Sequence, residues 1–352
     1  MDQFIEKGCI FFDNKYCRTE SSLYGDVVNK FESLYSKGTT KTIKGIVVSS
    51  GMQAIYHVLE QILRNHQTER KNIHILYSNN LYSRTNKTIK YLKQKNQQIN
   101  VNCFDIETPQ LLTNLFQEIG KNSYVVLFIE SVSNPKGLIF DFSLIQKYRT
   151  LAKKLYVVLD NSWMSGILFN PFLYDVDAVV NSTSKFYSNG KHIGGVILST
   201  NVDLISAIKN EIRMKGLHVS PFNLLQIKST WDSLQDRIHA SSLKTKELFE
   251  TLKLKFKILY PFGSQLYKKY INQDYGPCLI LFKIDFGSLE ARKILSNQSL
   301  IKYSCSYGTS YSKINTFVIR DHNDNSKSWL RLYVGYEENV ETLYQKIIQL
   351  FD

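Results

Sequence analysis

Two side chains near the middle of the chain have the types and the spacing to do chemistry. Asp160 closes one apolar run, and Lys185 follows a second apolar run, with the hydroxyls of Ser182 and Ser184 just before it. A lysine amine forms a Schiff base with an aldehyde, a carboxylate pairs with a protonated ring nitrogen, and hydroxyls bind a phosphate. An acid and a lysine 25 positions apart, each just past a predicted strand end, therefore indicate a pyridoxal 5′-phosphate (PLP) site.

Alternating strand and helix patterns surround this pair. Apolar runs predict strands at 45–49, 73–77, 99–104, 124–129, 155–159, 178–180 and 195–199, and helical spacing predicts helices at 26–36, 52–63, 88–95, 111–119 and 144–154. Several of these strands are apolar throughout, which requires a mainly parallel sheet covered by helices on both faces. Ligands bind beyond the carboxyl ends of such strands, where the polar motifs of this chain also lie.

The pattern changes beyond residue 204. We expect one long helical stretch over 223–254, then strands near 278–284, 301–304, 316–319 and 330–334 and helices at 289–295 and 340–351. Mixed strands with helices to one side indicate a smaller α+β domain. The chain is therefore divided into an N-terminal arm and helix (1–40), a large cofactor-binding domain (41–217) and a C-terminal small domain (218–352).

Composition limits the classes of protein that remain. A net charge of +13 suggests nucleic-acid binding, but the Lys and Arg residues are spread along the chain without a dense cluster, so we expect no nucleic-acid partner. The chain contains no run of about 18 apolar residues, so we expect no membrane span. The five cysteines are scattered and form no CxxC pair, which indicates reduced cytosolic thiols and no metal site. We expect a cytoplasmic protein.

Three further turns carry polar groups that suit a cofactor, although each is a weak signal alone. Ser50-Gly51-Met52 lies between a strand and a helix, where glycine and free N–H groups favour an anion. Tyr82 follows a strand and can stack on an aromatic ring. Asn134 precedes a proline, which holds it extended after a buried strand.

Together these segments resemble the Cys/Met-metabolism family of fold-type-I PLP enzymes, which includes cystathionine γ-synthase, cystathionine γ-lyase, methionine γ-lyase and their sulfhydrylase relatives. The similar segments, in chain order, are Ser50–Met52, Leu81–Thr85, Glu130–Pro135, Asp160–Ser162, Asn170–Pro171, Ser182–Phe186, Gly194–Gly195, Ser220–Phe222 with Arg237, Cys305–Gly308 and Leu330–Glu337. The resemblance implies a fold-type-I (aspartate-aminotransferase-like) α/β architecture and PLP as the cofactor.

The resemblance also implies roles for individual residues. Lys185 would form the Schiff base and move protons, Tyr82 would stack on the ring and take part in catalysis, and Asp160 would keep the pyridine nitrogen protonated. Asn134 would contact the phenolic oxygen of PLP. The phosphate would be held by Ser50, Gly51, Met52, Ser182 and Ser184.

The substrate side departs from the family in part. Arg331, helped by Ser306, would bind the substrate α-carboxylate through a planar fork. Arg84 stands two positions past Tyr82, where the family has a small residue or Cys, and a guanidinium there suits an anionic substrate tail; the alternative is a solvent-exposed or structural arginine. This is a divergent member of the family.

The N-terminal arm departs further. Family members carry a Tyr-x-Arg that reaches the phosphate of a neighbouring subunit, and Tyr16 and Arg18 match it with altered spacing. The rival alignment places Tyr24 and Asp26 there, but an acid near a phosphate is unfavourable. The resemblance implies a homodimer or a dimer of dimers, that is, a homotetramer.

The expected reaction is γ-replacement or γ-elimination on an amino acid with a leaving group at Cγ, such as an activated homoserine, cystathionine or methionine, through a vinylglycine–PLP intermediate. Two alternatives stay open. A β-lyase acting on cystathionine or cysteine derivatives uses the same residues. A PLP-fold protein without catalysis would be a binding or regulatory subunit, although the joint presence of Lys185, Asp160 and Arg331 argues against it.

Overall fold

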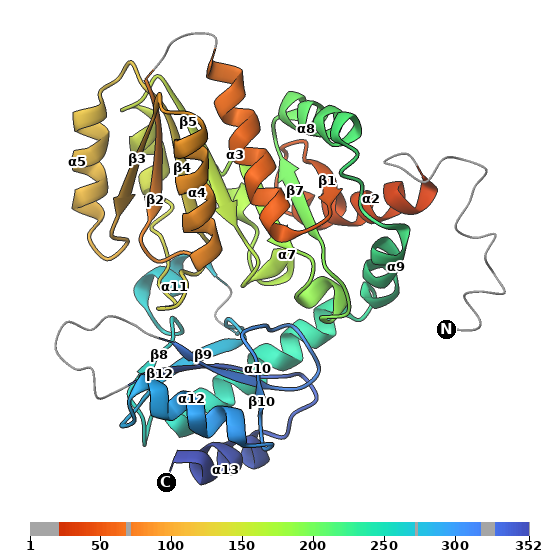
Figure 1. Ribbon diagram of the computed structural model, residues 1–352, viewed down its shortest axis with the longest axis vertical. Coiled ribbons are helices and arrows are strands. Elements are labelled where there is room, and N and C mark those ends of the chain that lie inside the picture. Colours follow the sequence, from red (N-terminus) through yellow and green to blue (C-terminus); the bar gives the residue numbers. More distant parts are fainter. Residues whose placement is uncertain (1–20, 68–71, 272–273, 318–327, 352) are drawn as a thin grey trace.

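The computed structural model describes residues 21–67, 72–271, 274–317 and 328–351. Figure 1 shows two lobes, each built around one β-sheet, with the long helix α10 (Leu234–Leu252) running from the larger lobe into the smaller one. The α/β architecture predicted from the alternating pattern is confirmed.

The larger lobe contains a seven-stranded sheet in the order β1-β7-β6-β5-β4-β2-β3. Its strands are β1 (Lys44–Val48), β2 (Ile73–Ser78), β3 (Ile99–Phe104), β4 (Tyr124–Glu130), β5 (Lys154–Asp160), β6 (Ala178–Ser182) and β7 (Gly195–Ser199). Neighbouring strands pair in parallel except around β7, which is antiparallel to β6 and β1. The carboxyl ends of the other six strands therefore share one edge of the sheet.

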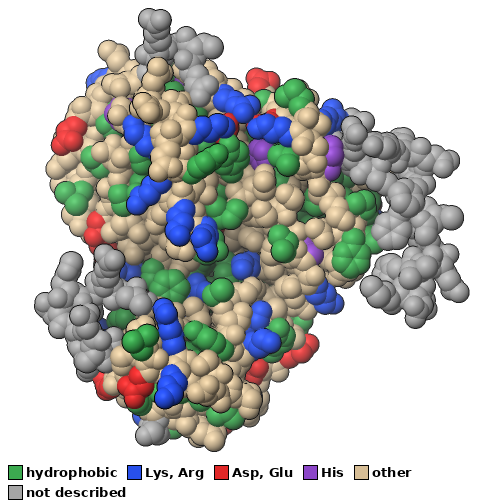
Figure 2. All heavy atoms as spheres, viewed as in Figure 1, with side chains coloured by type: hydrophobic (Ala, Val, Ile, Leu, Met, Phe, Trp, Pro, Cys, Tyr) green, Lys and Arg blue, Asp and Glu red, His purple; other side chains and the backbone are tan. Residues whose placement is uncertain are grey.

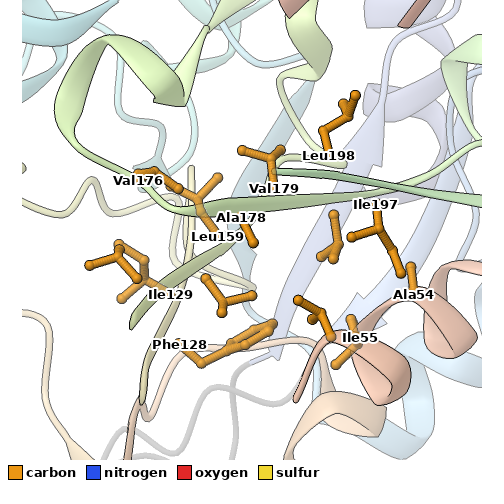
Figure 3. Close-up of a cluster of buried hydrophobic side chains, with 14 of the residues drawn as sticks. Ala54, Ile55, Phe128, Ile129, Leu159, Val176, Ala178, Val179, Ile197 and Leu198 are labelled. Atoms are coloured by element: carbon orange, nitrogen blue, oxygen red, sulfur yellow. The ribbon is translucent and has the colours of Figure 1, made fainter. Parts of the chain in front are cut away.

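Helices cover both faces of this sheet. They are α2 (Ser22–Ser36), α3 (Gly51–Gln67), α4 (Ser83–Lys95), α5 (Pro109–Ile119), α6 (Leu144–Arg149), α7 (Ser165–Leu168) and α8 (Val202–Lys215). Figure 3 shows Ala54 and Ile55 of α3 packed against Phe128 of β4 and Ile197 of β7, all buried. Burying such aliphatic and aromatic side chains stabilises the fold by roughly 1.5–3 kcal/mol each, so this packing holds the first turn of α3 beside the sheet edge.

The smaller lobe contains a five-stranded sheet in the order β10-β11-β12-β9-β8. The strands are β8 (Ile258–Leu259), β9 (Leu279–Ile284), β10 (Lys302–Tyr303), β11 (Lys313–Phe317) and β12 (Ser328–Tyr333). Helices α12 (Ser288–Asn297) and α13 (Val340–Phe351) cover one face over a separate core that includes Ile314, Leu330 and Leu332. Side chains alternate along each strand, so the neighbours of these three residues in the sequence point to the other face of the sheet, toward the larger lobe.

The single helix expected over 223–254 is wrong. Two helices are present instead, α9 (Pro221–Thr230) and α10, separated by a short break. In the break, Trp231 packs edge-on against Phe31 of α2, with 4.8 Å between ring centroids. The Thr230 carbonyl accepts a hydrogen bond from the Arg237 guanidinium at 2.8 Å rather than continuing the helical ladder. Tertiary contacts therefore override the local helical period.

Three smaller expectations also need correction. The helix predicted over 144–154 ends at Arg149, whose guanidinium donates to the carbonyl oxygens of Leu155 and Asp175 and ties the turn to β5. The 14-residue helix α8 was not predicted, although its Asn201 N-cap and left-handed Gly216 are recognisable end signals. Helix α2 begins at Ser22, inside the segment interpreted as an arm.

Candidate active site

The carboxyl edge of the large sheet brings together polar groups that are far apart in the sequence. Asp160 ends β5, and Glu130 ends the neighbouring strand β4, directly opposite Asp160 in the register. Ser182 ends β6, three residues before Lys185. Parallel strands end at a common edge, so four side chains that were expected at the site, or next to it, converge there.

Lys185 lies between the two lobes. Its Nζ donates to the Ser306 hydroxyl at 3.2 Å and lies 4.9 Å from the centroid of the Tyr307 ring. Gly308 has a φ of +85°, and a Cβ there would stand 2.4 Å from the Lys185 carbonyl carbon, so only glycine lets this loop approach so closely. The loop that carries Ser306 is thereby held against the lysine.

The Lys185 amine is tuned by its surroundings. Burial, and then the positive charge of Arg331, lower its pKa to about 8, with a smaller contribution from Lys313. Asp160 acts in the opposite direction. A lysine with this pKa is partly neutral near neutral pH, and the neutral amine is the form that attacks an aldehyde or accepts a proton.

Two carboxyl groups lie side by side at the ends of β4 and β5, and the Asp160 carboxyl is close enough to affect the pKa of this amine. Burial raises the pKa of Asp160, while hydrogen bonds from Ser162, including its backbone N–H at 2.9 Å, lower it in part. Glu130 is buried, and burial followed by the nearby charge of Asp160 raises its pKa well above the usual value. Glu130 accepts the backbone N–H of Tyr82 at 2.7 Å, which places it as a support for the start of α4. In the sequence, Glu130 stands out only as part of the segment Glu130–Pro135, although a carboxyl group at the end of a fully apolar strand is itself a signal.

The turn that was expected to hold the phosphate lies where α3 begins. Ser50 caps the helix, with its hydroxyl accepting the Gln53 N–H at 3.1 Å, and the first N–H groups of a helix have no intrahelical acceptor. A Cβ on Gly51 would stand 2.8 Å from the Ser182 Cβ, so glycine brings the helix start against the end of β6. The Ser184 hydroxyl instead bonds to the backbone of Gly194, at 3.0 Å and 3.3 Å, and stabilises its own loop.

The remaining large-domain residues line the same edge. Asn134 is buried, and its Oδ1 has no hydrogen-bond partner among the described residues. Tyr82 directly precedes α4, as its N-cap residue, and 45% of its surface is exposed, as a ring available for stacking would be. Arg84 is exposed on the first turn of α4, and no ion-pair or hydrogen-bond partner is present for it in the described part of the chain.

The small sheet contributes the cationic side of the site. Arg331 is buried on β12, and its guanidinium donates to the Cys305 carbonyl at 2.6 Å and to Asn315 Oδ1 at 3.3 Å. Tyr307, which sequence analysis did not single out, is buried beside Trp163, with ring centroids 6.3 Å apart. These residues come from a loop and strands whose pairing no local sequence pattern reveals.

The arm residues Tyr16 and Arg18 lie outside the described residues. The rival pair is engaged within its own chain: Tyr24 is buried in α2 with its hydroxyl bonded to the backbone of Val47, and Asp26 pairs with Lys228 at 2.6 Å. The assignment of Tyr16 and Arg18 to a partner's phosphate site stays a prediction.

Comparison with known proteins agrees with this geometry. Residues 16–343 match the Cys/Met metabolism PLP-dependent enzyme family. The chain belongs to this family. Within the family it is 25% identical over 321 residues to a cystathionine beta-lyase of Schizosaccharomyces pombe, covering 86% of this chain and 78% of that protein. It is 23% identical over 334 residues to an L-methionine gamma-lyase of Fusobacterium nucleatum, covering 87% and 79%.

A cystathionine beta-lyase of Saccharomyces cerevisiae is 30% identical over 183 residues, which are 51% of this chain. The chain thus spans 38% of the length of that protein. Among solved structures, a cystathionine gamma-lyase of Micromonospora echinospora superposes with a TM-score of 0.81 at 18% identity, over 96% of this chain and 88% of that one. A cystathionine gamma-synthase of Xanthomonas oryzae pv. oryzae gives 0.80 at 18% identity, over 97% and 89%. The fold predicted for this family member is confirmed.

The lowered pKa of Lys185 leads to a testable pH dependence. The rate at which PLP and borohydride label Lys185 in cofactor-free protein should rise with pH and reach half its maximum near pH 8, because only the neutral amine reacts. Ordinary lysines reach that point near pH ~10.4. Peptide mapping after labelling at a series of pH values measures both. A midpoint for Lys185 equal to that of the surface lysines would contradict this account.

Proposed function

We propose that this family member binds PLP through Lys185 and catalyses γ-replacement or γ-elimination on an amino acid with a leaving group at Cγ. The observation that supports this most is the convergence of Lys185, Asp160 and Arg331 from three separate segments. Each charge is close enough to shift a pKa of another: Arg331 lowers that of Lys185, and Lys185 lowers that of Asp160. A binding subunit without catalysis would have no need to keep this arrangement.

The residues present fit PLP. The unpartnered Oδ1 of buried Asn134 and the close approach of Gly51 to Ser182 are features that a bound polar group would explain. The phosphate would lie against the N–H groups of Gly51 and Met52 and the Ser182 hydroxyl, because a helix N-terminus favours an anion. Ser50 would position this turn through its cap, and Ser184 would position Gly194 behind it.

Bound PLP supplies an electron sink for the negative charge that develops at Cα of an amino acid. The carboxylate of Asp160 would hold a proton at the pyridine nitrogen and strengthen that sink. The Lys185 amine, released once substrate is bound, would take the proton from Cα, give that proton up again, and only then take one from Cβ, because a single mobile base on one face reaches both positions. Arg331 would fix the α-carboxylate, while the ring of Tyr82 would cover the cofactor.

A β-lyase remains the second candidate, because several of the similar proteins are cystathionine beta-lyases. Cystathionine distinguishes the two reactions. Cleavage at Cγ yields cysteine, 2-oxobutanoate and ammonia, whereas cleavage at Cβ yields homocysteine, pyruvate and ammonia. We expect 2-oxobutanoate from cystathionine, and a thioether product when an O-acyl-homoserine is supplied with a thiol. Pyruvate as the main keto acid would assign the β-lyase reaction, and no product with any of these substrates would support the non-catalytic alternative.

The exposed guanidinium of Arg84 is proposed to favour a substrate or nucleophile with an anionic tail. Arg84 lies one residue past the start of α4 and two past Tyr82. If the ring of Tyr82 covers the cofactor, this guanidinium would lie near the outer end of the substrate. Arg84→Ala should lower kcat/KM for an anionic-tailed substrate such as O-succinyl-homoserine by roughly 10- to 150-fold and leave a neutral-tailed one unchanged. Lys87→Ala, one turn further along the same exposed helix, is the matched control. Equal losses on both substrates, or none on either, would contradict the role.

Assembly is proposed to complete the site. We expect a homodimer or a homotetramer in which Tyr16 and Arg18 reach the partner's phosphate site, because soluble oligomers of this kind are usually closed and symmetric. Light scattering of the active protein measures the oligomeric state, and an active monomer would overturn the proposal.

No helix in the described part of the chain is long and apolar enough to cross a membrane. A cytoplasmic location is likewise proposed.

A further inference from the structure

The small sheet presents a second buried cation to the site beside Arg331. Lys313 begins β11 and retains 6% of its surface exposure, which is rare for a lysine. In the antiparallel register, Lys313 stands opposite Tyr333, and Asn315 stands opposite Arg331. Directly opposed residues lie on the same face of a sheet, so Lys313 and Arg331 are diagonal neighbours on the face turned toward the larger lobe.

Lys313 has no anionic partner in the described part of the chain. Its ammonium lies 5.1 Å from the centroid of the Tyr311 ring, a cation–π contact. The other titratable groups that face it are Lys302 of the neighbouring strand β10, the thiol of Cys305, the phenol of Tyr333 and the amine of Lys185. Two of these groups, Lys302 and Lys185, are cations and none is a carboxylate. Arg331 is a third cation, diagonal to Lys313 in the sheet.

A buried ammonium without a counter-charge is unfavourable, because burial removes water that no ion replaces. Burial and the repulsion from Lys302 lower the pKa of Lys313, and Lys313 in turn contributes to lowering the pKa of Lys185. The charge of Lys313 therefore acts at the amine of the candidate site. Figure 2 shows the same imbalance on the surface: Lys and Arg side chains gather over α4 and around the hollow between the lobes, while acidic side chains lie mostly toward the rim.

We propose that Lys313 binds a second, distal anionic group of the substrate while Arg331 binds the α-carboxylate. The inference rests on the proposed function, because it needs an amino acid at Arg331, and it narrows the substrates to amino acids that carry an anionic group at the far end. Lys313 makes this contact from inside the site, whereas the exposed Arg84 lies at the rim of the opposite lobe. The buried position makes the contact strong, since little water screens it.

Binding of two unreactive amino acids of equal chain length tests this. L-2-Aminoadipate has a distal carboxylate and L-norleucine a distal methyl group, and neither carries a leaving group at Cγ. Calorimetry and the visible absorbance of the PLP-loaded protein report the affinity of each. The protein should bind aminoadipate more tightly than norleucine. Lys313→Met should weaken the binding of aminoadipate by roughly 10- to 150-fold and leave the affinity for norleucine unchanged. L-2-Amino-5-phosphonopentanoate, as a third ligand, separates a preference for phosphate from one for carboxylate.

Two variants serve as controls. Lys302→Met removes an exposed cation from the adjacent strand and should leave the preference intact, whereas Lys313→Arg should retain it. Lys313→Met shortens the side chain by only one heavy atom. Apolar replacement of a buried charge is often neutral or stabilising, so the melting temperature of this variant should not fall. Should it fail to fold, the unmodified protein still decides: equal affinity for aminoadipate and norleucine overturns the inference.

Failure of the inference and failure of the proposed function give different results. If norleucine and aminoadipate both change the cofactor absorbance with equal affinity, the PLP site stands and the second cation site is wrong. If neither amino acid alters the absorbance, or the protein takes up no PLP, the proposed function itself is wrong. If Lys313→Met weakens the binding of aminoadipate and norleucine equally, Lys313 supports the site and does not bind a distal group, which overturns the inference.

Discussion

Replacing Lys185 with alanine should abolish turnover and remove the borohydride-stable attachment of PLP, while PLP should still bind without a covalent bond, through its phosphate. Proton transfer by a positioned base contributes about 10²–10⁴-fold to a rate, and Lys185 is also the attachment point, so a loss at or above the upper end is expected. Absorbance before and after borohydride, peptide mapping and single-turnover kinetics measure the three effects.

Lys191→Ala provides the matched control for this change. Lys191 lies in the same loop after β6 but is exposed. It should retain activity, the yellow colour and the label on Lys185. Full activity in Lys185→Ala, or a label that moves to Lys191 in the unmodified protein, would show that the lysine of the site has been assigned wrongly.

Replacing Arg331 with alanine should cause the second-largest loss of catalytic efficiency. A carboxylate held by a guanidinium through two charge-assisted hydrogen bonds, each contributing about 1.5–3 kcal/mol, predicts a fall in kcat/KM of roughly 10²–10⁴-fold. The loss should appear mainly in KM, because the α-carboxylate is present before and during the reaction. Steady-state kinetics with the preferred substrate measure it.

The Arg331 prediction needs a control for structure, because this guanidinium also donates to Cys305 and Asn315. Norleucine and 1-aminopentane differ by the α-carboxylate, so their difference in affinity isolates the contact. That difference should vanish in Arg331→Ala and persist in Arg292→Ala, which alters an exposed arginine on α12. If the difference persists in both variants, another residue binds the carboxylate.

Local sequence patterns were enough to predict the framework of the large sheet. Strands β3 and β7 have the predicted bounds, and β2, β4 and β5 agree within a residue or two, because an apolar run bounded by polar turns is a pattern of neighbouring residues in the chain. The same reasoning placed Asp160 and Lys185 after strand ends. In a parallel sheet all such ends meet at one edge, so the convergence of these residues followed from strand direction alone.

Tertiary structure decided the features that depend on distant partners. The break at Trp231 arises from packing against Phe31, roughly two hundred residues away in the chain, and no helical period encodes it. Glu130 became a support of the site only through its pairing with Asp160 and its bond to Tyr82. Local periodicity reports burial, but it cannot say which buried groups will touch.

The cationic side of the site shows this division most clearly. The sequence by itself singled out Arg331, through a segment that resembles the family, and Lys185, as the candidate reactive amine. Whether Lys313 faces the site or solvent depended on the register of β11 against β12, since a shift of one residue would turn its side chain to the opposite face. Only the folded chain brings that ammonium, without a carboxylate, beside Arg331 and Lys185, because charges separated along the sequence interact through the space that folding creates.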